Sequence, residues 1–547
     1  MNYNATIELF PETAERVQRA LDNTERLDPG ASIISTATFL NGMVMDVKCV
    51  GAESVDEGAW TEAVLMKPDE NGNLSEVTGS QVSDDYLGEW KLEYEGDTYT
   101  AEVKVNPDKP MRDAYKGFAH QEPGVCADCG KPFPVQRIDS VVNYLNLQRF
   151  SSLDHNYGLW YDLRRTDHER VRRADGDVWA PFYEQPFARS GQGTAWDGLS
   201  RYDLTKPNQW YWHRLNQFAQ KAESKGILLF NEHYFQHNIL EAGAHWVDCP
   251  WRPVNNINGT QFPEPVPFAG DKRIFIAEQF YNEQDETLRP LHKQYIRMCL
   301  EQLKDHPNVV HLISAEYTGP LHFTRFWLET IAEWEAETGL HPLIALSCTK
   351  DAQDAILSDP QLSKVVDIID IRYWHYNTQE LWAPEAGKNM APRQWMRKTK
   401  VGKTGFDEVY KAVREYREKY PDKAVTYFSQ QFPQMGWAVL MGGGSLPNIP
   451  IRTQSGNALQ QTLLNDICLM NNVPAQGCVA LGNKEKGYLL YSQSSNINVE
   501  VAPGKYQLFQ VNAKTGEITS EKVTIQLSTT FKKADTSPNK IYWLRKK

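Results

Sequence analysis

Between about residues 135 and 475, short apolar strands alternate with amphipathic helices, and this alternation constrains the fold more than any other feature. Apolar runs of strand length are separated by segments with helical spacing of apolar residues, at 210–225, 291–304, 323–338 and 406–419. Strands that alternate with helices form parallel sheets, because each crossover returns the chain to the same end of the sheet. We therefore expect an α/β fold with a parallel sheet.

The number of strand-helix units predicts a closed barrel. Eight such units fit a (β/α)8 TIM barrel with enlarged loops. A doubly wound open sheet is the alternative, but no G-x-G-x-x-G motif follows a strand, so its dinucleotide-binding form has no support. The eight strands are expected at 154–161, 178–183, 227–234, 309–316, 343–347, 365–374, 425–429 and 445–449.

Near both ends of the chain the sequence pattern changes and favours β-strands. Residues 88–105 alternate polar and apolar side chains around a turn at Glu95, Gly96 and Asp97, which predicts a hairpin. Only the first twenty-odd residues read as helical. Residues 487–519 contain three further strand-like runs separated by Pro-Gly and Thr-Gly turns. We expect an N-terminal β-sandwich at 1–134, the barrel at 135–477 and a C-terminal β-sandwich at 478–547.

Composition and charge exclude several classes of protein. The net charge of −12 is spread along the chain, and no basic stripe exists that a phosphate backbone would require. The apolar runs are too short for a membrane-spanning helix. The first residues lack a secretory signal, which fits a cytoplasmic protein or one whose leader has been removed. Nucleic acid and a membrane span are therefore not expected, and the oligomeric state is left open.

The cysteines give little indication of a metal site. Cys126 and Cys129 have zinc-knuckle spacing, but no second such pair or HxxxH follows. Two loop thiols are the preferred interpretation. The H-E-x-x-H motif is also absent, so we expect neither a catalytic metal nor a cofactor.

Glu316 is the leading catalytic candidate. In a TIM barrel the active site lies at the carboxyl ends of the strands. The apolar run VVHLISAE delivers Glu316 to such an end, where partial desolvation by aromatic residues would raise its pKa and suit it to general acid catalysis. The alternative is an ion-paired structural glutamate.

Other polar and aromatic residues follow the predicted strands. Aromatic rings stack on sugar rings while carboxylates, amides and imidazoles bind hydroxyls, so this mixture suits a carbohydrate pocket. Tryptophans on the predicted helices, Trp212, Trp327 and Trp334, are expected in the core instead. The strand-end residues include Glu184, Glu232, Asp197 and Asp370; Trp196, Trp246, Trp251, Trp374 and Trp382; His233, His237, His245, His322 and His375; and Arg372 and Gln431.

The blocks WVDCPWRPVNNING (246–259) and HKQYIRMCLEQLKDHPNVVHLISAE (292–316) resemble the barrels of clan A glycoside hydrolases. The chain is most similar to bacterial members with β-sandwich domains on both sides, including apiosidase-like and poorly characterised polysaccharide-degradation families. In that clan the acid/base glutamate follows strand four, usually after Asn. Glu316 matches this position, with Ala315 in place of Asn. The resemblance implies an oligo- or polysaccharide substrate and a periplasmic, cell-surface or secreted location.

The chain departs from the clan at strand seven, where the nucleophilic glutamate is expected. That strand reads TYFSQQF and places Gln430 and Gln431 there. An amide cannot form a glycosyl-enzyme intermediate, which excludes ordinary retaining chemistry through these residues. Three explanations stay open: a partner carboxylate from another strand, an engineered glutamate-to-glutamine change, or a protein that binds glycans without cleaving them.

Asp370 is the preferred partner of Glu316, with Glu232, Glu184 and Asp197 as alternatives. Its position on the strand places it on the same face as Arg372 and Trp374, and strands two apart are separated by roughly 10 Å. Such a separation is compatible with the roughly 6.5–9.5 Å that an inverting pair requires. A salt bridge between Asp370 and Arg372 is the competing interpretation.

The working hypothesis is an exo-acting glycoside hydrolase on side chains of a complex polysaccharide. Glu316 would be the acid, with Asp370 or Glu232 as the second catalytic carboxylate. The alternatives are a non-catalytic glycan-binding protein on a degenerate barrel, or a polysaccharide lyase that uses Arg372 and Tyr373. The expected substrate-binding residues are Glu184, Trp196, Asp197, His233, His237, Arg372, Trp374, His375 and Gln431.

Overall fold

The chain is seen in a computed structural model that forms two compact units. Unit 1 comprises residues 1–344, 354–365 and 385–395, and unit 2 comprises 345–353, 366–384 and 396–547. The residues that the structure describes are 1–9, 32–50, 60–69, 74–77, 89–105, 124–125, 132–133, 142–143, 145–146, 150–157, 185–195, 200–236, 239, 246, 249–262, 275–315, 317–378, 380–387, 404–427, 435–451, 458–534 and 536–547.

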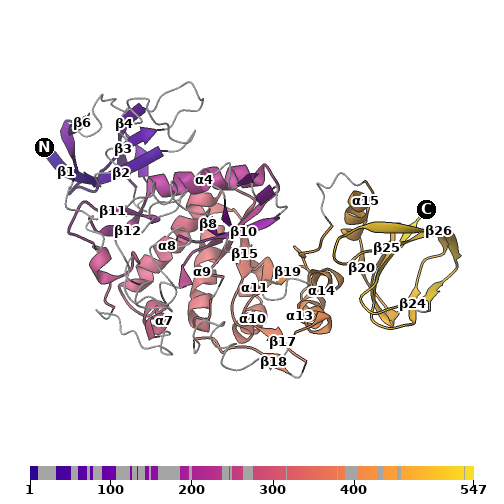
Figure 1. The fold of residues 1–547 in the computed structure, drawn as a ribbon. Coiled ribbons are helices and arrows are strands. Elements are labelled where there is room, and N and C mark those ends of the chain that lie inside the picture. The colour runs from indigo at the N-terminus through magenta and orange to yellow at the C-terminus, as the bar shows by residue number, and fades with distance from the viewer. Residues whose placement is uncertain are drawn as a thin grey trace. The chain divides into compact units, whose positions relative to one another are not determined.

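Unit 1 begins with two sheets that share one apolar core. The first contains β1 (Asn2–Leu9), β7 (Asp97–Val105) and β6 (Glu89–Tyr94), in that order. The second has the order β2 (Ser32–Thr38), β3 (Val44–Val50), β4 (Trp60–Pro68) and β5 (Leu74–Glu76). The core between them includes Met45, Leu65, Trp90 and Tyr99. Figure 1 shows β2 of this region beside helix α4 (Gln209–Glu223).

The predicted hairpin in this region is confirmed, whereas the predicted N-terminal helix is wrong for residues 2–9. Strands β6 and β7 are joined at Glu95 and Gly96, whose φ angles of 51° and 83° are those of a tight hairpin turn. Residues 2–9 form β1, which pairs in parallel with β7. Its partner lies some ninety residues away, so the local sequence does not reveal the pairing.

A parallel sheet follows in unit 1. It has the order β10 (Ser152–His155), β13 (Leu228–Glu232), β14 (Val309–Leu312) and then the first residues of β15 (Leu343–Leu346). Helix α4 leads into β13, α8 (Leu288–Leu303) leads into β14 and α9 (Leu321–Thr338) leads into β15. Helices α8 and α9 lie side by side (Figure 1). Between β10 and β13 the chain forms an antiparallel hairpin, β11 (Phe187–Arg189) and β12 (Tyr202–Pro207).

Unit 2 continues from the last residues of β15 into β16 (Ile368–Ile371) and β19 (Ala424–Tyr427), again parallel. A short hairpin, β17 (His375–Tyr376) and β18 (Leu381–Trp382), follows β16. Helix α13 (Phe406–Lys419) precedes β19 and has the predicted bounds. Helices α14 (Gly436–Met441) and α15 (Ala458–Ile467) come after it.

The C-terminal part of unit 2 is formed by two antiparallel sheets. The larger has the order β20 (Asn471–Val473), β22 (Cys478–Asn483), β23 (Gly487–Ser492), β28 (Ile541–Lys546), β25 (Gly504–Val511) and β26 (Ile518–Leu527). The smaller contains β21 (Ala475–Gln476), β24 (Ile497–Glu500) and β27 (Thr530–Lys533). The three strand-like runs predicted at 487–519 are therefore confirmed. The domain borders and the two β-sandwich domains stay predictions.

Six of the eight predicted barrel strands are confirmed among the described residues, as a parallel half-barrel of mixed α/β type. The strand predicted at 178–183 lies outside them, and β10 pairs directly with β13, so no strand separates these two. The strand predicted at 445–449 is wrong. That segment contains Pro447, which has no N–H to donate, and Leu446 has a φ of 51°, which a regular strand does not tolerate. Ser445 bonds to β19, through its N–H and the carbonyl of Val425.

No described helix combines the length and the hydropathy that a bilayer span requires.

We predict that the core beneath the larger C-terminal sheet contributes strongly to the stability of unit 2. Leu489 is fully buried in it against residues such as Trp543 and Phe509. Leu489→Ala should lower the free energy of unfolding of this unit by about 2–5 kcal/mol, because it removes buried methyl groups and leaves a cavity. Denaturant titration measures this. Leu469→Ala is the matched control, since Leu469 is 52% exposed, and equal losses in both variants would contradict the prediction.

Candidate active site

The strands of unit 1 present two chemically different faces. His155, Asn231 and His311 are register partners across β10, β13 and β14, so they share one face. That face meets the helices, because His155 Nε2 lies 2.8 Å from the hydroxyl of Tyr211 on α4. The opposite face, which we call the inner face, carries Asp154, Phe230, Glu232, Val310 and Leu312.

Glu232 is the polar centre of the inner face. It is the last residue of β13 and is only 7% exposed. Its Oε2 accepts hydrogen bonds from the Ser314 hydroxyl at 2.9 Å and from the backbone N–H of Ala315 at 2.8 Å. The Asn156 amide lies 3.4 Å from Oε1. Glu232 therefore joins the ends of three neighbouring strand segments.

These contacts fix the backbone that leads to residue 316. Ala315 directly precedes Glu316, which itself lies outside the described residues. After it, the Tyr317 hydroxyl donates to the carbonyl of Pro320. Gly319 is required beside this ring, because a Cβ there would lie 2.5 Å from the ring of Tyr317. The chain on both sides of Glu316 is thus held in place by defined contacts.

His233 lies on the helix-facing side, with both ring nitrogens engaged. The Trp327 Nε1–H of α9 donates to His233 Nδ1 at 3.1 Å, so His233 Nε2 carries the proton and donates to His311 Nδ1 at 3.0 Å. Burial and the neighbouring His311 hold the pKa of His233 well below its usual value. This ring therefore packs between the sheet and α9 and not on the inner face.

In unit 2, Asp370 and Arg372 form the ion pair that was the competing interpretation of Asp370. Both side chains are nearly fully buried. The Arg372 Nε–H donates to Asp370 Oδ2, and the Thr426 hydroxyl donates to Oδ1 at 2.7 Å. Both oxygens of Asp370 therefore have donors, which leaves it poorly placed to act as a base or nucleophile.

Trp374 and His375 are also packed within unit 2. The Trp374 indole N–H donates to Gln353 Oε1 at 2.7 Å, and Lys350 Nζ lies 4.9 Å from the ring centroid. His375 is stacked on Trp382 with centroids 5.1 Å apart, and burial lowers its pKa to about 4.

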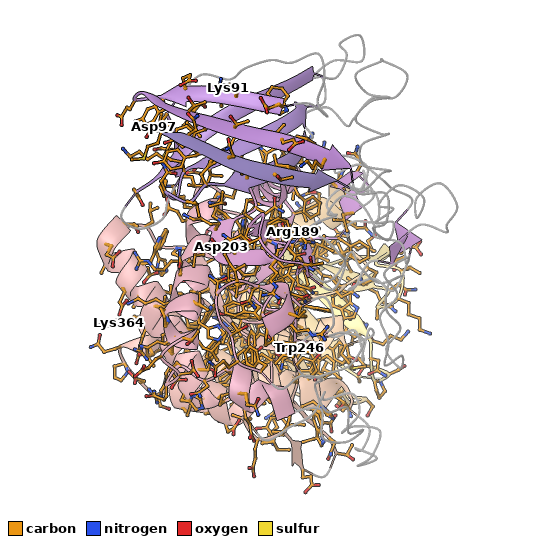
Figure 2. All side chains as sticks on the ribbon, turned by 90° about the vertical axis from the view of Figure 1, so that its left-hand side faces the viewer. Lys91, Asp97, Arg189, Asp203, Trp246 and Lys364 are labelled. Carbon is orange, nitrogen blue, oxygen red and sulfur yellow. The ribbon has the colours of Figure 1, made fainter. Side chains whose placement is uncertain are left out.

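The described tryptophans of the predicted loops do not form an exposed platform. Trp246, Trp251, Trp374 and Trp382 are all buried, like the helix tryptophans Trp212, Trp327 and Trp334, whose core position is confirmed. Figure 2 shows Trp246 within the body of unit 1, and Arg189 and Asp203 of the β11–β12 hairpin nearer the N-terminal sheets. The expectation that these four loop tryptophans stack on a sugar is therefore not supported, because their ring faces are covered.

Several predicted site residues lie outside the described residues. Their positions relative to Glu232 therefore stay predictions. They are Glu316, Glu184, Trp196, Asp197, His237, His245, Gln430 and Gln431, together with the Cys126 and Cys129 pair.

Beside the loops after β13 and β14 lie polar groups that, apart from His322, the sequence did not single out. The Tyr281 hydroxyl donates to Gln236 Oε1 at 2.5 Å, and the rings of Tyr281 and Tyr317 lie 5.2 Å apart. Two residues after Tyr281, the buried carboxylate of Glu283 holds His322 at the start of α9. The segment 281–284 lies between two helices of the sequence, so a search of strand ends could not find it.

A metal-binding cluster or a cavity could also mark a site at the ends of β13 and β14. Within the described ranges, no three His, Cys, Asp or Glu side chains are grouped to hold a metal ion. A cavity of 1040 Å³ lies between the N-terminal sheets and α8, lined by residues such as Met66, Lys206, Arg297 and Trp334. None of the predicted site residues that the structure describes lines it.

We predict that unit 1 loses stability in mild acid. Burial lowers the pKa of His155 and of His311 to about 3, and lowers that of His292 to about 4. The unfolded chain binds protons at these rings below about pH 6.5, whereas the folded chain does not until pH 3–4. The contribution of these histidines to the free energy of unfolding should therefore be constant above about pH 6.5. Below about pH 6.5 the free energy of unfolding should fall, by up to about 1.4 kcal/mol per pH unit for each histidine. Denaturant titrations from pH 7.5 to 4.5 measure this slope, and His155→Gln should reduce it by one histidine's share; an unchanged slope would contradict the assignment.

Comparison with solved structures gives only distant likenesses. The chain is similar to a xyloglucanase of glycoside hydrolase family 44 from Paenibacillus polymyxa, at 11% identity and a TM-score of 0.26, over 62% of this chain and 84% of that one. It is similar to an α-amylase from H. orenii at 10% identity and a TM-score of 0.32, over 75% and 95%. It is also similar to the endo-glycoceramidase II from Rhodococcus sp., at 10% identity and a TM-score of 0.25, over 62% of this chain and 85% of that one. TM-scores this low carry no argument about this chain.

No curated protein matches the sequence. A family model does: the model described as "Domain of unknown function (DUF6298)" matches residues 126–465, well over half of the chain. This match spans β10 to β19 and therefore all of the strand-end residues discussed above. The chain belongs to the DUF6298 family.

Proposed function

We propose that the protein is a glycoside hydrolase whose active site lies on the inner face at the carboxyl ends of β13 and β14. The observation that carries the proposal is the buried Glu232 carboxylate, which binds the Ser314 hydroxyl and the Ala315 N–H directly before Glu316. Parallel strands of α/β folds place their active sites at this end. The sequence resemblance to clan A hydrolases, in which Glu316 matches the acid glutamate after strand four, supports the same reaction class. In the described sheet β14 is the third strand in order, so the support concerns the reaction class and not the strand number.

Glu316 is the general acid in this proposal. It donates a proton to the glycosidic oxygen as the bond to the anomeric carbon breaks. A water molecule on the other face of the sugar forms the new bond to the anomeric carbon and gives its proton to a second carboxylate, which acts as the general base. Glu232 is a positioning residue, because one of its oxygens accepts from the Ser314 hydroxyl and from the N–H of Ala315, the residue before Glu316. Burial near apolar groups would keep the acid protonated at neutral pH.

The second carboxylate is proposed to come from Glu184 or Asp197. Asp370 is the less favoured partner, because Arg372 and Thr426 occupy both of its oxygens. The enlarged strand-end segments favour a closed pocket and hence attack at the end of a polysaccharide side chain. The non-catalytic alternative is distinguished by measuring turnover.

We predict that Glu316→Gln strongly reduces hydrolysis of natural glycosides. General acid catalysis contributes typically 10²–10⁴-fold, so a loss of about that size is expected for sugar leaving groups. Dinitrophenyl glycosides of the same sugar should be far less affected, because their leaving group departs without a proton. Release of reducing sugar from a panel of plant and microbial oligosaccharides measures the first effect, and absorbance of the nitrophenolate measures the second.

Glu333→Gln provides the matched control, since Glu333 lies on α9 and is 51% exposed in an ion pair with Lys293. It should retain wild-type activity. Equal activity of the Glu316→Gln protein and the wild type would remove Glu316 from the mechanism. Binding of a glycan without turnover by the wild type would favour the non-catalytic alternative.

We predict that Glu232→Gln and Glu232→Ala differ sharply. The amide oxygen of Gln can still accept from Ser314 and from the Ala315 N–H, so activity should stay within about tenfold of the wild type. Ala removes both acceptors and leaves buried donors unpaired, which costs about 1–3 kcal/mol per group and displaces the chain before Glu316. A loss of more than about 100-fold in kcat/KM is therefore expected for Ala. If Gln is as damaging as Ala, Glu232 itself performs the proton transfer.

A further inference from the structure

We propose that His322, held by Glu283, binds a hydroxyl group of the carbohydrate beside the carboxyl ends of β13 and β14. This inference rests on the proposed function for the chemical class of its ligand. It assigns a binding role to two residues that belong to neither the Glu232 contacts nor the predicted catalytic pair.

The pair combines a buried carboxylate with an exposed imidazole. His322 Nδ1 lies 2.6 Å from Glu283 Oε2, and the side chains are 56% and 7% exposed, respectively. Glu283 Oε1 accepts from the Gln284 amide at 3.0 Å. Burial, the largest influence, raises the pKa of Glu283, but the hydrogen bonds from Gln284 and His322 outweigh it and bring the pKa below its usual value. The carboxylate is therefore ionised at neutral pH and accepts the Nδ1–H of His322.

This arrangement fixes the tautomer of the neutral ring. With its proton on Nδ1, His322 presents the lone pair of Nε2, and no described residue is bonded to that nitrogen. The buried rings of His233 and His292 differ in this respect, because both nitrogens of each ring are bonded. In His292, for example, Nδ1 meets the Tyr234 hydroxyl and Nε2 meets the carbonyl of Phe280. Of these three rings, that of His322 has a nitrogen without a described partner, and its side chain is 56% exposed.

The pair is rigidly placed beside the strand ends. His322 is the second residue of α9, which begins directly after the loop that carries Glu316. The carbonyl of Glu283 accepts from the Arg289 guanidinium of α8 at 3.2 Å. The neighbouring Tyr281 bonds to Gln236 in the loop after β13 and lies 4.7 Å from the Phe323 ring. The segment that carries Glu283 thus contacts the loops after both β13 and β14, through Gln236 and Tyr317.

An imidazole prepared in this way suits a sugar hydroxyl. The hydroxyl proton is donated to Nε2, and the Glu283 carboxylate strengthens this bond by polarising the ring through Nδ1. Because the ring is already oriented, little side-chain entropy is lost on binding. A single neutral hydrogen bond is worth about tenfold in affinity.

The chain contains a matched pair for comparison. His341 Nδ1 contacts Glu335 Oε1, and His341 is 51% exposed. This second pair lies at the opposite end of α9, away from the strand ends that face the candidate site. It shares the chemistry of the first pair but not its location.

The experiment measures glycan binding in the Glu316→Gln protein, in which turnover is suppressed. The probes are oligosaccharides of plant and microbial polysaccharides. The affinity of the oligosaccharide that binds most tightly is then measured by calorimetry. His322→Ala in this background should weaken binding about tenfold. His341→Ala should leave it unchanged. In the active protein, His322→Ala should raise KM with little effect on kcat, which a general loss of structure would not produce.

The outcomes separate this inference from the proposed function. Equal affinities for the parent and His322→Ala, or equal losses for the two histidine variants, would overturn the inference. Absence of binding by every probe would overturn it as well. A wild-type protein that hydrolyses no glycan but loses affinity on His322→Ala would refute the proposed hydrolase while the binding role of His322 stands.

Discussion

The two-residue side-chain period of β13 and β14 determines which groups can meet at the candidate site. Parallel pairing places Glu232 and Leu312 on one face and Asn231 and His311 on the other. A shift of the pairing by one residue would send the Glu232 carboxylate into the helix layer, where the His233 ring now lies. The contacts of Glu232 with Ser314 and Ala315, and hence the geometry around Glu316, depend on this register.

Burial of polar groups in unit 1 follows a consistent chemical pattern. Histidines that face the helices are neutral because desolvation disfavours the imidazolium, and they are bonded to other rings, hydroxyls or carbonyls. Glu232 and Glu283, in contrast, each accept from several donors at the end nearest the candidate site. The buried polar residues of unit 1 therefore have two roles. The neutral histidines take part in packing, and the two glutamates orient the groups that donate to them.

Many helices and strands between β10 and β19 could be predicted from the sequence, because the pattern of apolar residues that defines them is local. Helix α13 matches 406–419 because its apolar residues recur with the helical period, and six strands were found as short apolar runs. Other features depend on distant partners. Strand β1 is defined by β7, and the ion pair of Asp370 with Arg372 could be listed from the sequence but not preferred over a catalytic role. Glu283 and His322 are 39 residues apart, and only the fold brings them together.

The tryptophans show why residue type alone is a weak guide to a binding surface. An indole ring is suited to a sugar face, but it is also the largest apolar group available to fill a core. Trp251 stacks on His292 and lies close to Phe280, and the Trp374 N–H donates a hydrogen bond to Gln353. The decision between the two uses depends on which neighbours cover the ring, and those neighbours come from helices far along the chain.

The division of the chain into units has a consequence for how it can be dissected. Residues 345–353 and 366–384 belong to unit 2, although they are flanked on both sides by segments of unit 1. Strand β15 itself changes from one unit to the other between Ile344 and Ala345. A fragment that begins at residue 396 would therefore lack β16, the hydrogen-bonding neighbour of β19. No single cut separates the units, so truncation is an unsuitable way to isolate the proposed catalytic chemistry, and point substitution is the appropriate tool.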